Sequence, residues 1–118
     1  MTKVSGGKNI CGVSIGVLSL ESYFPKPPGH IKNPSSLPFT ICYELLRGIS
    51  VPDLLYRPTP AMENTILEAV HSLEMQGVKA ITGSCGFLAL YQPALVKAVK
   101  IPVFASSLIQ VPLAYQMT

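Results

Sequence analysis

Apolar residues fall into short runs that are separated by stretches rich in proline, glycine and polar residues. The first run, Val13 to Leu20, is apolar on both alternating faces, which suits a parallel strand covered on both sides. Phe39 to Leu46 predicts a second strand, although Tyr43 to Leu46 could also begin a helix. Val78 to Thr82 and Ile101 to Ala105 predict a third and a fourth strand.

Helical spacing is found mainly in the second half of the chain. Apolar residues recur at this spacing from about Ala61 to Gln76, and Gly77 follows as a stop signal. The stretch before this helix carries several prolines and predicts only a connection. Phe87 to Val99 predicts a short helical region between the third and fourth strands. Ser106 is a suitable N-cap for a last segment, in which Pro112 favours a helix that begins properly only near that residue.

Strands that alternate with helices are joined by right-handed crossovers, which make the sheet parallel. The sequence therefore predicts an α/β fold, a parallel sheet of about four strands with helices on both faces. The carboxyl ends of parallel strands lie along one edge of the sheet. That edge should bring together the loop that begins at Glu21, the turn from Ser84 to Gly86, and the pair Ser106-Ser107.

Cys85 is the main candidate for chemistry. It ends the third predicted strand, where Gly83, Ser84 and Gly86 give the backbone room to turn sharply. If a helix follows, its free N–H groups would stabilise negative charge on the sulfur. The alternative is a small buried hydrophobe, which is what most free cysteines in cores are. The predicted edge of the sheet brings the Cys85 turn close to the Glu21 loop and the Ser106-Ser107 pair. This favours a chemical role for Cys85 over a packing role.

The segment from Glu21 to Pro38, called the Pro-rich segment below, separates the first two strands. Its prolines and Gly29 exclude a helix and predict a long loop. Long loops inside compact domains are usually functional lids or binding loops. The alternative is a surface excursion without a role.

Composition narrows the class of protein. The chain has 118 residues, of which 48% are hydrophobic and 13% charged, and this length is typical of one domain. The formal charge of +3 comes from scattered Lys and Arg residues without a basic run, so no nucleic-acid partner is expected. Neither a signal-peptide layout nor an apolar run long enough for a membrane span is present, which predicts a cytoplasmic protein with no membrane partner.

The three cysteines lie at wide spacing, with no CxxC pair and with two histidines in the whole chain. Neither a disulfide framework nor a zinc site is expected from this pattern. Cys11 lies at the amino end of the first predicted strand, and Cys42 lies within the second. Both are therefore interpreted as packing residues.

Three blocks of sequence form a combined motif. The first is Gly16-Val17-Leu18 leading to Phe24-Pro25 and Pro28 to Pro34, the second is Gly77 to Thr82 before Ser84 to Leu88, and the third is Ile101 to Phe104 before Ser106 to Gln110. Together, over nearly the whole chain, they resemble the aspartate/glutamate racemase superfamily, in its branch of uncharacterised racemase-like proteins.

The resemblance implies two similar flavodoxin-like α/β domains, each giving one cysteine to a shared active site that needs no cofactor and no metal. Residues 1–118 would form the N-terminal domain, and Cys85 matches its cysteine. The implied function is racemisation of an amino acid, with the Cys85 thiolate moving the proton on the carbon next to a carboxylate. The second cysteine would come from an absent C-terminal domain or from a second copy in a homodimer.

The same resemblance implies a site for a small carboxylate-bearing substrate around Cys85. Backbone N–H groups and serine hydroxyls would hold the carboxylate, and an acidic residue after the first strand, typically Asp, is functional in some members. The residues in these positions are Ser84, Gly86, Phe87, Ser106, Ser107 and Glu21.

Other functions remain open at this stage. Cys85 could act as a nucleophile in a reaction like that of the similar maleate isomerases, or as an acid after a decarboxylation. A non-catalytic domain that keeps the carboxylate pocket is an alternative from a different class.

Overall fold

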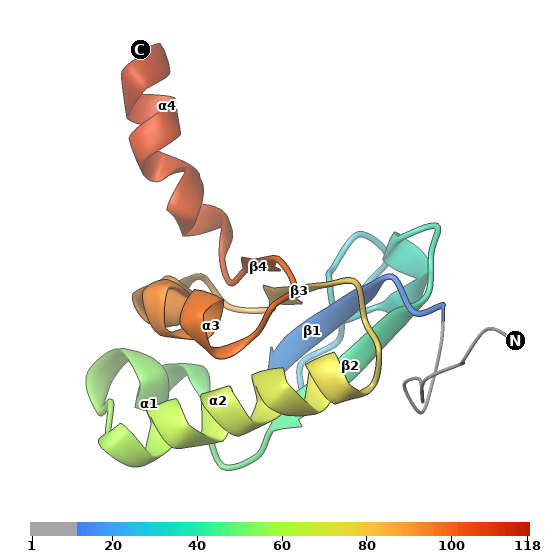
Figure 1. Ribbon diagram of the computed structural model, residues 1–118, viewed down its shortest axis with the longest axis horizontal. Helices are drawn as coiled ribbons and strands as arrows, with labels where there is room; N and C mark the ends of the chain where they lie inside the picture. Colours follow the sequence, from blue (N-terminus) through green and yellow to red (C-terminus); the bar gives the residue numbers. More distant parts are fainter. Residues whose placement is uncertain (1–11) are drawn as a thin grey trace, which may run out of the picture.

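A computed structural model describes residues 12–118, so Cys11 lies outside the described residues. Four strands form one sheet in the order β2-β1-β3-β4 (Figure 1). They are β1 (Ile15–Leu20), β2 (Ile41–Leu46), β3 (Ala80–Gly83) and β4 (Val103–Phe104). Every pairing is parallel. The predicted α/β fold with a parallel sheet is therefore confirmed, and the second run is a strand rather than a helix.

Four α-helices accompany the sheet in the described residues: α1 (Val51–Tyr56), α2 (Pro60–Met75), α3 (Gln92–Ala98) and α4 (Val111–Met117). Short 3-10 helices cover Pro34–Ser36, Gly86–Tyr91 and Ser107–Gln110. The predicted helical region after Cys85 is thus split into a 3-10 turn and α3. Ser106 caps the last 3-10 helix, and the α-helix after it begins at Val111, next to Pro112, as predicted.

The helix α2 packs against β1 and β2 through an apolar stripe at helical spacing. Ile66, Val70 and Leu73 on this stripe have no exposed surface. Burying each such side chain stabilises the fold by roughly 1.5–3 kcal/mol. A Cβ atom added at Gly16 would lie 2.9 Å from the Leu73 side chain, so the glycine lets helix and strand approach closely. Gly77 ends this region with a φ of 86°, which glycine adopts without strain.

The helix α1 lies where the sequence predicted only a connection. Ser50 caps its first turn, and Asp53 completes a capping box by accepting from the backbone N–H of Ser50. Pro52 lies in the first turn, where its missing N–H costs nothing. The capping pattern Ser-x-x-Asp was the sequence signal for this helix, and the prolines concealed it.

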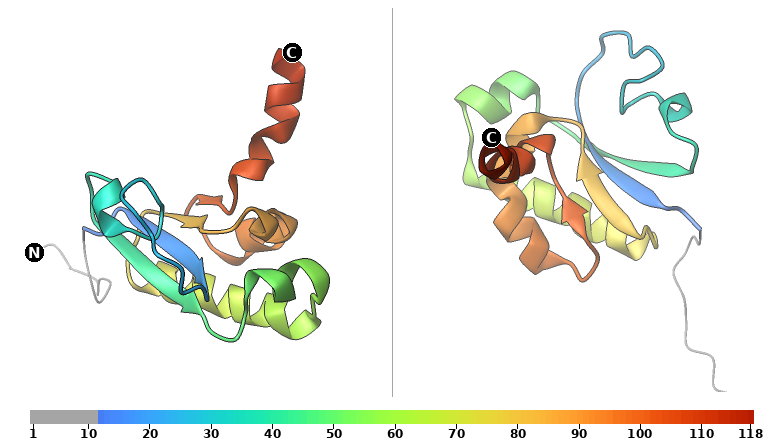
Figure 2. Two further views of the ribbon diagram at one scale, coloured as in Figure 1. Left: turned by 180° about the vertical axis from the view of Figure 1, so that it is seen from behind. Right: turned by 90° about the horizontal axis from the view of Figure 1, so that it is seen from above.

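Two different layers flank the sheet. The helices α2 and α3 pack against each other on one side, whereas the Pro-rich segment with its short 3-10 helix lies over the other side (Figures 1 and 2). The helix α4 projects away from the rest of the molecule and buries none of its residues. No helix in residues 12–118 is long and apolar enough to cross a membrane.

Candidate functional site

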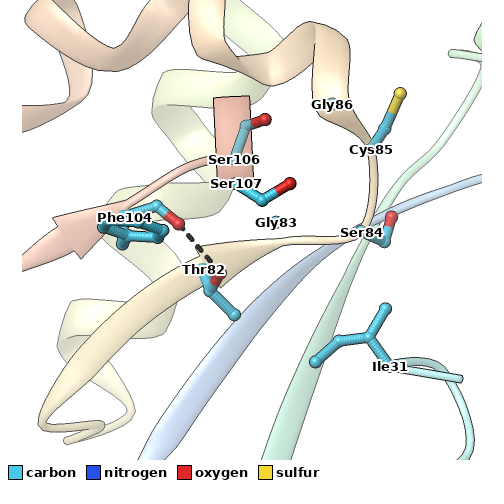
Figure 3. A pocket seen from close by; sticks show the side chains of 9 residues that line it. All are labelled: Ile31, Thr82, Gly83, Ser84, Cys85, Gly86, Phe104, Ser106 and Ser107. Atoms are coloured by element: carbon cyan, nitrogen blue, oxygen red, sulfur yellow. Dashed lines mark hydrogen bonds between the residues drawn. The ribbon is translucent and has the colours of Figure 1, made fainter. Parts of the chain in front are cut away.

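A cavity of about 220 Å³ lies at the carboxyl edge of the sheet (Figure 3). It is lined by residues from the Pro-rich segment, the end of β3 and the end of β4. They are Ile31, Thr82, Gly83, Ser84, Cys85, Gly86, Phe104, Ser106 and Ser107. The structure thus brings together the Cys85 turn, the serine pair and one residue of the Pro-rich segment.

Glycines make this cavity possible because two backbone turns approach closely there. A Cβ atom at Gly83 would clash with the carbonyl oxygen of Ala105 and lie 2.6 Å from the Leu88 side chain. At Gly86 the added atom would lie 3.3 Å from the Leu108 side chain, which is a tight contact. The small residues around Cys85 are therefore required by packing as well as by the turn.

Ser84 ties the turn to the central strand. Its backbone N–H donates to the Leu18 carbonyl at 2.9 Å, and its Oγ accepts from the Leu20 N–H at 3.2 Å. Since the oxygen is fixed as an acceptor, the hydroxyl proton is available to a ligand in the cavity. Ser84 can therefore act as a positioned hydrogen-bond donor.

The hydroxyl oxygen of Ser106 also accepts a hydrogen bond from a backbone N–H, on the wall of the cavity opposite Ser84. Its side chain is buried, and its Oγ accepts from the Leu108 N–H at 3.1 Å as an N-cap. The hydroxyls of Ser106 and Ser107 point across the cavity toward the Cys85 turn (Figure 3). Hydroxyl donors on two walls suit a carboxylate, which accepts several hydrogen bonds at once.

Cys85 lies in the turn between β3 and the following 3-10 helix, with an extended backbone and a half-buried side chain. Its carbonyl accepts from the Leu88 N–H at 3.2 Å, which fixes the turn. The sulfur points outward from the turn in Figure 3, away from the serine hydroxyls. Cys85 is nevertheless one of the residues that line the cavity.

Three lining residues were missed by sequence reasoning. Thr82 donates its hydroxyl to the Phe104 carbonyl at 2.8 Å and so closes the end of the sheet. The Phe104 side chain is 43% exposed, which leaves part of its ring free for a ligand. Ile31 is brought to the cavity by the Pro-rich segment (Figure 3). The signal for Thr82 and Phe104 was their position within two residues of a predicted serine.

Two predicted site residues do not line the cavity. The Glu21 carboxylate accepts from the Gly48 N–H at 3.1 Å and so holds the turn after β2. Phe87 packs against the hydrophobic core. Both residues therefore make structural contacts, and a role of either residue in substrate binding stays a prediction.

Cys42 lies against α2 rather than at the cavity. Its thiol donates to Gln76 Oε1 at 2.9 Å, and burial together with the nearby Glu44 charge raises the pKa of this thiol. The neutral thiol is therefore favoured, which agrees with a packing residue. Within residues 12–118, no group of three or more His, Cys, Asp and Glu side chains is close enough to hold a metal ion.

The chain is similar to several proteins that are named dimethylsulfoniopropionate lyases. It is 31% identical over 100 residues to "Dimethylsulfoniopropionate lyase 6" and to "Dimethylsulfoniopropionate lyase 3" of Emiliania huxleyi, over 84% of this chain and 26% of each relative. It is 27% identical over 106 residues to "Dimethylsulfoniopropionate lyase" of Durusdinium sp. clade D, over 88% of this chain and 35% of that relative. No protein-family model and no solved structure matches the chain.

These relatives correct the family prediction. The three blocks of sequence predicted a member of the aspartate/glutamate racemase superfamily and an isomerase, and this prediction is wrong because the relatives are named lyases. Their names give no support to the maleate isomerase and decarboxylase alternatives either. The chain spans 26% of the first two relatives, so their activity can be carried over only as a proposal.

Proposed function

We propose that this chain contributes to a lyase reaction on dimethylsulfoniopropionate, with the Cys85 cavity as the place where the substrate loses a proton. The observation that carries the proposal is the cavity itself, which is lined by a cysteine, by serine hydroxyls and by an aromatic ring. The similarity to lyases that are named for this substrate supports the choice of reaction.

The chemistry follows from the substrate. It carries a carboxylate at one end and a positively charged sulfur on the carbon two positions away. A base removes a proton from the carbon next to the carboxylate, and the released electron pair forms a carbon–carbon double bond. The carbon–sulfur bond breaks, its electrons leave with sulfur as dimethyl sulfide, and acrylate remains. The Cys85 thiolate becomes a thiol and later returns the proton to water.

This reaction removes one proton and returns none to the same carbon. Racemisation needs a base on one face and an acid on the other, whereas elimination needs a single base and a leaving group. One thiol is therefore sufficient for the proton transfer that we assign to Cys85. Since that thiol must stay reduced, we also propose a cytoplasmic setting.

The cavity offers complementary groups to both ends of the substrate. Hydroxyls of Ser84 and Ser106 are positioned to donate to the carboxylate, whose negative charge spreads during proton removal. The exposed ring of Phe104 can contact the positively charged sulfur, since an aromatic face attracts cations. No charged side chain among the lining residues competes with this arrangement.

The test is release of dimethyl sulfide and acrylate, measured by headspace gas chromatography and proton NMR, with the full chain and excess substrate. We expect product release by the wild type and by Cys42→Ser, because Cys42 lies against α2. Cys85→Ser should reduce the rate by about 100-fold or more, the usual effect of losing a catalytic base.

Equal rates for wild type and Cys85→Ser would contradict the assigned role of the thiol. Substrate binding without any product would favour the non-catalytic carboxylate-binding alternative over the lyase.

A further inference from the structure

Two lysines of the Pro-rich segment converge on one residue. Lys32 Nζ donates to the Leu20 carbonyl at 2.6 Å and to Ser22 Oγ at 3.0 Å. Lys26 Nζ donates to the Ser22 carbonyl at 2.7 Å. Both ammonium groups are therefore held around Ser22, directly after β1.

This pair of like charges has no carboxylate partner among residues 12–118. The ion pair found there within 4.0 Å joins Arg57 and Asp53 on α1, away from the Pro-rich segment. Burial and the charge of Lys26 both lower the pKa of Lys32. The Phe24 ring centroid lies 4.2 Å from Lys26 Nζ and attracts its positive charge. An anion between the two ammonium groups would relieve their mutual repulsion.

The lysine pair is connected to the Cys85 cavity through Leu20. The Leu20 N–H donates to Ser84 Oγ at the cavity, while the Leu20 carbonyl accepts from Lys32. Ile31, the residue before Lys32, lines the same cavity. The lining itself includes no charged side chain, so Lys32 brings a positive charge next in sequence to a lining residue.

We propose that Lys26 and Lys32 form a second binding site for the carboxylate of a small organic acid, separate from the Ser84 and Ser106 hydroxyls, on the side of the Cys85 cavity that faces the Pro-rich segment. An ammonium group has three donors, of which Lys32 uses two and Lys26 uses one in the hydrogen bonds above. The remaining donors can form charge-assisted hydrogen bonds to a carboxylate. The assignment deepens the proposed function and rests on it for the identity of the substrate.

Propanoate is a suitable probe because it has the carboxylate of the proposed substrate and no leaving group. It is titrated into the full chain while the lysine side-chain signals are followed by NMR, with propanamide as the uncharged control. We expect propanoate to shift the Lys26 and Lys32 signals and to raise the pKa of the Lys32 amine, since an opposite charge favours the protonated form. Propanamide should do neither.

Variants identify the site. Lys26→Met and Lys32→Met should each weaken propanoate binding about tenfold or more, the effect of losing one charge-assisted hydrogen bond. Lys32→Arg should retain most of the affinity because it keeps the charge. Lys79→Met is the matched control, since Lys79 is exposed and lies at the opposite end of β3. Circular dichroism checks that each variant is folded. If Lys32→Met does not fold, Lys26→Met alone tests the site.

Two results would overturn the proposal: unchanged propanoate affinity in the folded methionine variants, or no response of either lysine to propanoate. The propanoate experiment and the lyase test can give different answers. Propanoate binding through the lysines without release of dimethyl sulfide would support the anion site while the lyase proposal failed.

Discussion

Gly83 lines the candidate cavity at a point where the backbone leaves no room for a side chain. The backbone after β4 passes so close to it that the carbonyl of Ala105 leaves no room for a side chain. Gly86, one turn further along, has a tight but adjustable neighbour in the Leu108 side chain. The two glycines around Cys85 therefore differ in how strongly packing requires them.

We predict that Gly83→Ala lowers the free energy of unfolding by about 1–3 kcal/mol, the usual cost of overpacking against atoms that cannot move aside. Gly86→Ala should cost less, because the flexible Leu108 side chain can shift. Urea denaturation of both variants measures the difference. An equal or smaller loss for Gly83→Ala would show that β3 and β4 are further apart at the cavity than described.

Sequence reasoning reached Cys85, Ser84 and Ser106 because each stands at the end of a recognisable strand. It did not reach Ile31 or the lysine pair, since their positions depend on how the Pro-rich segment folds back over the sheet. That path is fixed by tertiary hydrogen bonds, such as the one from the Tyr43 hydroxyl to the Ile31 carbonyl at 2.7 Å. Contacts of this kind leave no periodic signal in a sequence.

At the scale of elements, the caps decide where helices begin. The helix α1 has six residues and buries only Leu54, so it depends on its capping box more than on packing. Such short helices are marginal on their own in water. The prolines that concealed α1 in the sequence are compatible with it because Pro52 lies in the first turn, where no N–H is needed.

We predict that Ser50→Ala destabilises the protein by about 1 kcal/mol, the typical cost of losing an N-cap side chain. Ser35→Ala, on an exposed turn of the Pro-rich segment, is a control that also removes a local hydroxyl hydrogen bond. Thermal unfolding by circular dichroism compares the two. No change for Ser50→Ala would mean that α1 is held by the burial of Leu54 rather than by its cap.

At the scale of the whole molecule, the parallel sheet explains why distant segments form one site. The segments after β1, β3 and β4 reach the same edge because all four strands run in the same direction. The alternation of strand and helix patterns made this arrangement predictable from the sequence. The sequence did not decide the type of reaction, because a cavity lined by a thiol and hydroxyls suits both racemisation and elimination.

The most direct experiment asks whether Cys85 removes a proton from the carbon next to a carboxylate. The full chain is incubated in deuterium oxide with 3-(trimethylammonio)propanoate, which resembles the proposed substrate but has a poorer leaving group. Proton NMR then follows the signal of the carbon next to the carboxylate. We predict that this signal decays with the wild type and with Cys42→Ser, and that Cys85→Ser abolishes the decay. Equal exchange in Cys85→Ser, or no exchange with any of the three proteins, would contradict the assignment of Cys85 as the base.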